Sequence, residues 1–300
     1  MKAIKAITLS LGDTKKPIIS KYELSIIVHK LFLSKIYNGE SINIQKERAG
    51  TTEVNKYLAQ LISEGILSHV KNINNVYALL GRMDANAEDI ACAIDPFCYV
   101  SHLSAMAYHG LTDRLPAKLI LSSPSDKDWK IHARERMHQD LGDEYDSYCS
   151  NGLIRLVRTK MEKINKTEIL CLRSSHLGAY KNVRDRTVRV STIGRTFLDM
   201  LRHPEHCGGI NHVLDVYEMY CKKYLRLITD DIDKHGNGIE KVRAGYIIDE
   251  LLGIKNEVVE GWTAFAQRGG SRKLDPSSEY IPKWSDKWML STNVIRSNVE

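Results

Sequence analysis

The chain has 300 residues, of which 43% are hydrophobic and 27% are charged. This length predicts two domains that each bury a core, and the composition excludes disordered and fibrous proteins. No apolar run approaches the roughly 18 residues of a membrane helix, and Lys5 interrupts the short apolar opening. We therefore expect neither a membrane span nor a signal peptide.

The net charge of +6 is concentrated in one part of the chain. Residues 1–82 contain twelve Lys and Arg against six Asp and Glu, whereas residues 83–300 contain 31 of each sign. A basic module attached to a neutral body suits a polyanionic partner such as DNA, although solubility alone could also explain the surplus. Six cysteines without a CxxC pair predict reduced thiols and a cytoplasmic location.

Residues 20–38 have apolar positions at helical spacing and predict the first strong helix, which we expect Asn38-Gly39 to end. A second helix is predicted at 51–64, with Val54, Leu58 and Leu61 on one side and polar, non-acidic residues on the other. Thr51 or Thr52 would cap its start, and Gly65 would end it.

Two β-rich runs then flank Asn74-Asn75, a dipeptide that tolerates the positive φ of a tight hairpin. A helix followed by a two-stranded wing predicts a winged helix-turn-helix domain over residues 1–82. Asn and Gln on the outer helix face can pair with adenine, and lysines with guanine or phosphate. The predicted DNA-binding residues are Lys46, Arg48, Thr51, Thr52, Asn55, Lys56, Gln60, Lys71 and Asn74.

One such module reads a single half-site, so we expect two molecules on an inverted repeat, or one molecule on two repeats with bent DNA. The alternative is that the winged helix contacts only protein.

Residues 83–300 predict a larger domain, mixed αβ at about 83–190 and mainly helical at about 191–300, so the fold class is α+β. Ser101 would cap a helix within 99–114, with Gly110 as its stop. We predict strands at 115–124, 152–159 and 168–173, and the clearest later helices lie in 212–225 and 240–253.

A second basic patch, for DNA or a protein partner, is predicted at Arg155, Arg158, Lys160, Arg184 and Arg186. Its alternative explanation is a solvated sheet surface, because acidic residues balance these charges in the domain as a whole.

Metal and catalytic patterns are weak. His102 and His109 lack an identifiable third ligand, and His203, His206, Cys207 and His212 lie in a loop that leads to a helix, so we expect structural histidines and no metal. The competing hypothesis is a DNA-targeted nuclease with a metal site in residues 115–173, built from Asp126, Asp128, Lys130 or Glu168. No P-loop, dinucleotide-binding glycine run or nucleophile elbow occurs, so we predict a protein without enzymatic activity or cofactor.

Three blocks after the winged helix resemble the AbiEi family of bacterial antitoxins and transcriptional regulators, from type IV toxin–antitoxin and abortive-infection systems. They are YVSHLSAMAYHGLTD (99–113), STIGRTFLDMLRHPEHCGGI (191–210) and VRAGYIIDELLG (242–253), followed by RKLDP and DKWMLSTN. The resemblance covers nearly the whole chain, and the order of the blocks carries it.

This resemblance implies an N-terminal domain that represses its own operon at inverted repeats, and a C-terminal domain that counters a nucleotidyltransferase-like toxin. It also implies that Arg195, Thr196 and Asp199 are structural rather than catalytic, with the Arg–Asp pair orienting a neighbouring loop.

Overall fold

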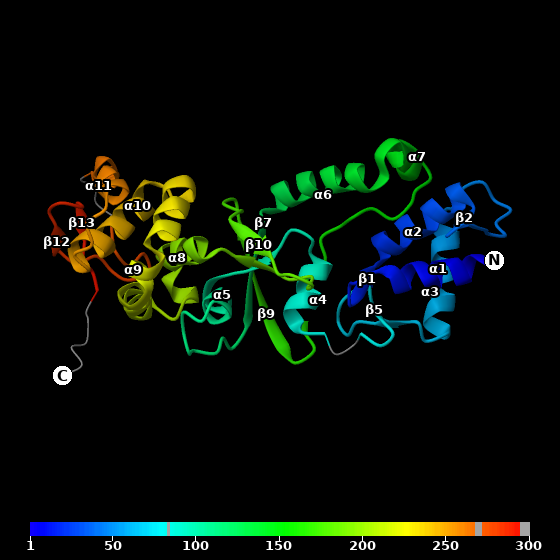
Figure 1. The fold of residues 1–300 in the computed structure, drawn as a ribbon, viewed down its shortest axis with the longest axis horizontal. Helices are drawn as coiled ribbons and strands as arrows, with labels where there is room; N and C mark the ends of the chain where they lie inside the picture. The colour runs from blue at the N-terminus through cyan, green and yellow to red at the C-terminus, as the bar shows by residue number, and fades with distance from the viewer. Residues whose placement is uncertain (83–84, 268–271, 295–300) are drawn as a thin grey trace. The chain divides into compact units, whose positions relative to one another are not determined.

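The structure is a computed structural model that describes residues 1–82, 85–267 and 272–294. Its fold is mixed α+β, as the sequence predicts (Figure 1). The chain forms two compact units: unit 1 contains 1–98, 123–175 and 183–188, and unit 2 contains 99–122, 176–182 and the described residues from 189 onward. The predicted domain boundary near residue 83 lies outside the described residues, so the division into domains 1–82 and 83–300 stays a prediction.

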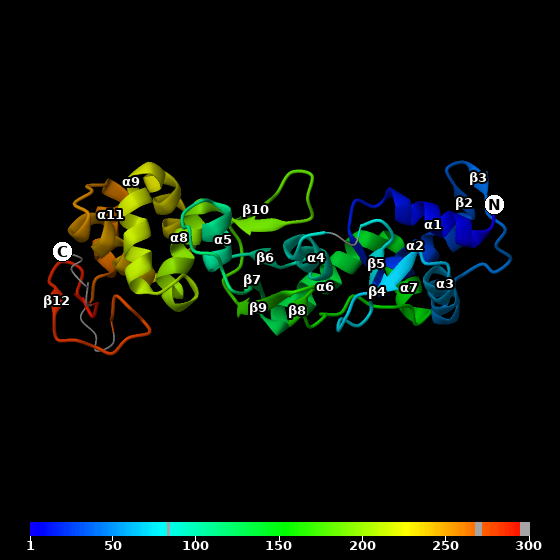
Figure 2. The same ribbon diagram turned by 90° about the horizontal axis from the view of Figure 1, so that it is seen from below.

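The N-terminal part of unit 1 has the element order of a winged helix-turn-helix. A three-stranded antiparallel sheet of order β1-β5-β4 is grouped with three helices (Figure 1 and Figure 2). The elements are α1 (Ala3–Asp13), β1 (Ile18–Ser20), α2 (Lys21–Ser34), α3 (Thr51–Ser63), β4 (Leu67–His69) and β5 (Val76–Leu79).

Helix α2 begins at a capping box in which Ser20 and Glu23 each bond the other's backbone N–H. The predicted end at Asn38-Gly39 is wrong, because Lys35 adopts the left-handed conformation (φ 52°) and ends the helix after Ser34. Asn38 and Gly39, both with positive φ, instead form the turn between β2 (Ile36–Tyr37) and β3 (Glu40–Ser41).

Helix α3 buries Val54, Leu58 and Leu61, the apolar side that the sequence predicts. Its predicted cap is wrong: Gly50 occupies the N-cap position, and the Glu53 carboxylate accepts the Gly50 N–H at 2.9 Å. The Thr51 hydroxyl is not available for capping, because it donates to the Gly152 carbonyl at 2.7 Å. The wing hairpin is confirmed, with positive φ at Asn75 near its tip.

The remainder of unit 1 consists of helices α4, α6 and α7, the short η1 turn and the β8–β9 hairpin. The segment SDKDWK, which holds three residues of the nuclease hypothesis, starts the long helix α6, because Ser125 caps it by accepting the Asp128 N–H at 3.2 Å. The elements are α4 (Ala87–Ile94), α6 (Asp126–Leu141), η1 (Gly142–Glu144), α7 (Tyr145–Ser150), β8 (Lys163–Ile164) and β9 (Thr167–Ser174). Of the predicted strands, 168–173 is confirmed in β9.

The strand predicted at 152–159 is wrong, because residues 153–160 form neither helix nor strand. Three of its apolar side chains, Leu153, Ile154 and Leu156, pack on the core of unit 1, whereas Val157 is exposed. We call residues 153–160 the connecting segment. The three packed apolar residues of this segment are therefore buried, fully or in part, by contacts with the core and not by pairing with a neighbouring strand.

The apolar core of unit 1 extends beyond the winged helix. The buried cluster that contains Leu24, Val28 and Leu58 also contains Met137 of α6 and Tyr148 of α7. The predicted reader helix is thus supported by residues from much later in the chain.

Unit 2 contains the strands of a mixed sheet and most of the later helices. Strand β6 pairs parallel with β11 and antiparallel with β7, and β10 pairs antiparallel with β11. The strands are β6 (Tyr99–Val100), β7 (Leu119–Pro124, whose last two residues belong to unit 1), β10 (Tyr180–Asn182), β11 (Arg189–Ser191), β12 (Trp284–Ser285) and β13 (Leu290–Ser291).

The helical half of unit 2 confirms the helices predicted in 212–225 and 240–253. Helix α5 is shorter than the range in which it was predicted, and Gly110 follows it with positive φ. The helices are α5 (His102–Tyr108), α8 (Ile193–Arg202), η2 (Pro204–His206), α9 (Ile210–His235), α10 (Gly238–Gly245), the π-helical turn η3 (Tyr246–Leu251), α11 (Glu257–Gly261) and η4 (Trp262–Phe265). None of the helices in the described ranges combines the length and hydropathy that a membrane crossing requires.

Gly194 sets how closely α8 approaches α9. A Cβ atom at this position would lie 2.0 Å from the Leu227 carbonyl oxygen and 2.6 Å from Asp231 Oδ2. The same Asp231 oxygen accepts the Thr192 hydroxyl at 2.6 Å, beside the start of α8. Only glycine fits here, because both neighbouring groups are already held in place.

We expect Gly194→Ala to lower the free energy of unfolding by about 1–3 kcal/mol, since the helices must separate to admit the methyl group. Gly261→Ala is the matched control: Gly261 is also helical, and a Cβ there meets nothing within 4 Å. Urea denaturation followed by circular dichroism measures both. Equal stability of the two variants would contradict this account of the α8–α9 contact.

Candidate nucleic-acid interface

The outer face of α3 presents polar side chains to solvent. Thr52, Asn55 and Lys56 are all exposed, on the side opposite the buried residues Val54 and Leu58. An amide, a hydroxyl and an ammonium group on an exposed helix face can contact base edges and phosphates in a major groove. These three are the predicted α3 residues for which no hydrogen bond or ion pair occupies the side chain within the described residues.

Three other predicted residues are held within the chain. The Gln60 amide donates to Glu64 Oε1 at 2.8 Å, and Thr51 bonds Gly152 as described above. Lys46 forms an ion pair with Glu53. The hydrogen bond that Lys46 donates to the Glu53 carboxylate is the largest cause that lowers the pKa of Glu53 below its ordinary value. Lys46 and Thr51 therefore fix the start of α3, and Gln60 is held at its end.

The remaining predicted contacts flank α3. Arg48 is exposed just before the helix, and Lys71 and Asn74 are exposed in the loop between the strands of the wing. Because Arg48 precedes the helix N-terminus, its charge adds to the favourable environment for a phosphate there.

The second predicted patch divides between two segments. Arg158 is engaged: it donates to Asp126 Oδ1 at 2.5 Å and to Ser123 Oγ at 2.6 Å. Lys160 pairs with Glu162 at 2.5 Å on the surface, and Arg155 is exposed.

The other two arginines of the patch lie in the loop that joins β10 and β11. Arg186 contacts Asp89 at 2.5 Å, and Arg184 is almost fully exposed. Arg158 and Arg186 are thus held by ion pairs in partly buried positions, Lys160 and Arg184 form ion pairs on the surface, and Arg155 is exposed.

The sequence analysis missed Gly152, although its carbonyl accepts a hydrogen bond from the first residue of α3. It also missed Tyr148, whose hydroxyl lies 2.7 Å from Ser25 Oγ of α2. The partners are separated by 101 and 123 positions, so no local pattern could have revealed either contact.

The carboxylates of the nuclease hypothesis serve as partners of neighbouring side chains. Asp126 accepts from Arg158 and Arg173, and Asp128 Oδ2 accepts the Ser125 hydroxyl at 2.6 Å. Glu168 lies opposite Lys163 in the β8–β9 hairpin. In the ranges that the structure describes, no three His, Cys, Asp or Glu residues form a group that could hold a metal ion.

In unit 2, the Arg195-Asp199 pair is buried and holds a loop, in agreement with the structural role that the resemblance implies. Arg195 Nε donates to Asp199 Oδ1 at 2.8 Å, and Arg195 Nη2 donates to the His176 carbonyl at 2.6 Å. Thr196 is buried and donates to the Thr192 carbonyl at 2.8 Å.

His102 lies beside this pair and is buried, and its ring meets those of the exposed His203 and the half-buried His206. Its ring centroid is 5.6 Å from that of His203 and 5.9 Å from that of His206. Its Nδ1 is 2.8 Å from Ser101 Oγ, whereas its buried Nε2 has no hydrogen-bond partner. Burial is the main cause that lowers the pKa of His102 to about 4.

Comparisons with known proteins assign this chain to no family. No family model matches the chain, and no curated protein matches it. Among solved structures, the crystal structure of the RV2827C protein from Mycobacterium tuberculosis is similar, with 10% sequence identity and a TM-score of 0.47. The match covers 95% of this chain and 89% of that chain. Such a likeness carries no argument about the site, which is therefore assigned from the chain's own residues.

The lowered pKa of His102 makes stability depend on pH. In the unfolded chain the His102 ring takes up a proton near pH 6.5, whereas in the folded chain it does so only near pH 4. The stability that the neutral ring contributes is therefore fully present above pH 6.5 and is lost as the pH falls from 6.5 to 4. We expect this residue to contribute a loss of about 3 kcal/mol between these pH values.

Urea denaturation at several pH values measures this loss. His102→Asn removes the titrating ring, and Asn tolerates the positive φ of 51° at this position. The variant should therefore lose less stability on acidification than the natural chain. Parallel pH profiles for the natural chain and His102→Asn would contradict the assignment.

Proposed function

We propose that this protein is a sequence-specific DNA-binding transcriptional repressor whose reader is α3. The observation that carries the proposal is that Thr52, Asn55 and Lys56 are exposed on α3, the helix that directly precedes the wing strands. The charge distribution supports it, because the net positive charge of the whole chain resides in residues 1–82. Lysine and arginine side chains near DNA phosphates release counterions and thereby drive association.

In this proposal, Asn55 specifies sequence and the cations position the helix. An asparagine amide can accept and donate together at one adenine edge, which gives about 1–3 kcal/mol of discrimination. Arg48 lies before the N-terminus of α3, where it would meet the phosphate backbone. Two molecules would bind the halves of an inverted repeat, because one winged helix covers a single half-site.

The proposal extends to an antitoxin of a type IV toxin–antitoxin system that represses its own operon. This extension rests on the order of the sequence blocks at 99–113, 191–210 and 242–253 that resemble the AbiEi family. The partner would be a nucleotidyltransferase-like toxin encoded beside this gene. Co-expression with that neighbouring gene tests the extension: restored growth supports it, and unrelieved growth arrest contradicts it.

We expect Asn55→Ala to weaken binding to promoter DNA by about 1–3 kcal/mol and to relax the sequence preference, since it removes a base contact. Fluorescence anisotropy with the upstream promoter and with a scrambled duplex measures both quantities.

We expect Lys56→Ala and Arg48→Ala to weaken binding to all duplexes and to reduce the slope of affinity against salt by about 1 each, since each removes one phosphate contact. Lys5→Ala on α1 is the matched control, because it deletes the same charge from an exposed residue outside the proposed contact face. If Lys5→Ala changes affinity and salt slope as much as Lys56→Ala and Arg48→Ala do, the net positive charge alone drives binding, and the proposed contact face on α3 is wrong. No binding by the natural chain at low salt would overturn the repressor proposal itself.

A further inference from the structure

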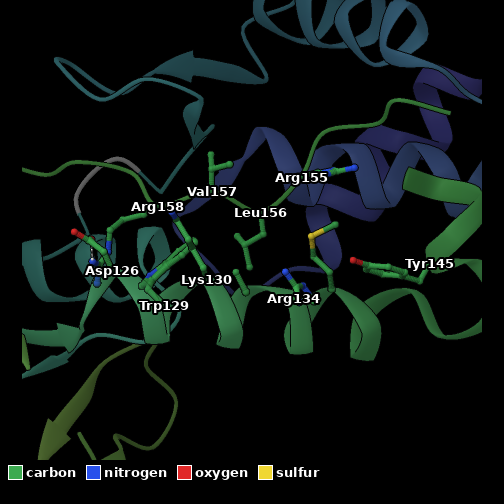
Figure 3. Close-up of a pocket in the computed structure, with 11 residues that line it drawn as sticks. Asp126, Trp129, Lys130, Arg134, Tyr145, Arg155, Leu156, Val157 and Arg158 are labelled. Carbon is green, nitrogen blue, oxygen red and sulfur yellow. Dashed lines mark hydrogen bonds and ion pairs between the residues drawn. The ribbon is translucent and has the colours of Figure 1, made fainter. Parts of the chain in front are cut away.

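A cavity of about 400 Å³ lies within unit 1, between α6 and the connecting segment (Figure 3). Trp129, Ala133 and Met137 of α6 are all buried and line one wall. Leu156 points from the connecting segment toward the helix. The volume falls within the range of about 300–1,000 Å³ that is typical of small-molecule sites. The cavity can therefore take the apolar body of a ligand.

The rim of this cavity carries cations that have no partner. Lys130, Arg134 and Arg155 line it and make no hydrogen bond or ion pair within the described residues. The single acidic residue of the lining, Asp126, is already engaged by Arg158 and Arg173. An apolar wall below unpaired cations matches a molecule that carries a negative charge at one end.

Nucleic acid suits this cavity less well. Stacking of bases requires an accessible aromatic face, but Trp129 is only 3% exposed and its ring centroid lies 5.6 Å from the Arg158 guanidinium. The other aromatic residue of the lining, Tyr145, already stacks on His138 with ring centroids 3.6 Å apart. The Trp129 indole N–H is also occupied, because it donates to Asp95 at 2.9 Å. The site therefore favours an aliphatic or small aromatic body over an extended strand.

Hydrogen bonds connect the walls of the cavity to α2 and α3, the helices of the proposed DNA-binding domain. The Tyr148 hydroxyl hydrogen-bonds both with Ser25 of α2 at 2.7 Å and with the Ile154 carbonyl of the connecting segment at 2.6 Å. Gly152, one residue before that segment, accepts from Thr51 at the start of α3. A ligand that holds the connecting segment thus acts on the elements that position α3.

We infer that this cavity binds a small amphipathic anion, a carboxylate or sulfonate on an apolar body, and that the bound anion weakens DNA binding. The second part rests on the proposed function. Its sign follows from charge: an anion held beside Arg134 and Arg155 reduces the attraction of unit 1 for phosphates. By linkage, DNA weakens binding of the anion by the same factor.

The binding part is tested on the full chain without DNA. The probe is 8-anilinonaphthalene-1-sulfonate, titrated while its fluorescence is followed, with octanoate as a competitor. We expect saturable binding, displacement by octanoate, and weaker displacement by the neutral analogue octanamide. Arg134→Ala and Lys130→Ala should each weaken the probe about tenfold, because each removes a charge-assisted contact.

Lys127→Ala is the matched control, since Lys127 is exposed on the same helix but lies outside the lining. Thermal denaturation of each variant separates loss of the site from loss of the fold. Arg134→Glu provides a second variant of opposite charge, which should abolish probe binding. Non-saturable binding, equal affinity of Arg134→Ala and Lys127→Ala, or equal displacement by octanamide would each overturn the anion site.

The regulatory part is tested by anisotropy with promoter DNA. Saturating octanoate should raise the dissociation constant of the natural chain about fivefold and leave that of Arg134→Glu unchanged. An unchanged constant in the natural chain would overturn the coupling while leaving the anion site intact. If the chain binds no DNA at all, the proposed function fails, and the probe titration still decides whether the site exists.

Discussion

The hydroxyl of Tyr148 joins the parts of unit 1 that the chain order separates. The side chain is fully buried, and burial raises the pKa of its hydroxyl well above the ordinary value, so the group stays neutral. It bonds with Ser25 of α2 and with Ile154, and its ring meets that of His29 edge-on at 5.1 Å. A buried polar group is costly without partners, so these bonds select one arrangement of α2, α7 and the connecting segment.

This constraint explains why α2 is buried on more than one side. Leu24, Val28 and Leu31 belong to the core of the winged helix, while Ser25 and His29 contact α7. A helix with only one apolar stripe would be satisfied by the winged helix alone. The position of α3 therefore depends on residues near 148–154, and these residues support both the proposed DNA-contacting face and the proposed anion site.

Unit 2 is organised by buried cations instead. Arg195 pairs with Asp199, and Arg202 pairs with Glu240 at 2.6 Å, all four side chains being nearly inaccessible. Arg243 is also buried and donates to the carbonyls of Leu201 and Lys273. Buried ion pairs add little net stability, but leaving one charge without its partner is expensive. These residues thus fix the relative arrangement of α8, α10 and the later turns.

Helices α2 and α3 and the wing hairpin follow from local sequence, because apolar periodicity and turn residues are properties of neighbouring positions, whereas α1 and β1 were not predicted. The sequence by itself also determined the long helices of unit 2, whose apolar positions repeat over several turns. The strand predicted at 152–159 is wrong, because an alternating apolar pattern is compatible with more than one structure. Only the tertiary structure decided which predicted side chains remain available: Thr51 and Gln60 are occupied, while Asn55 and Lys56 are exposed. Contacts such as Thr51–Gly152 and Tyr148–Ser25 span more than 100 positions, and they exist only because folding brings these residues together.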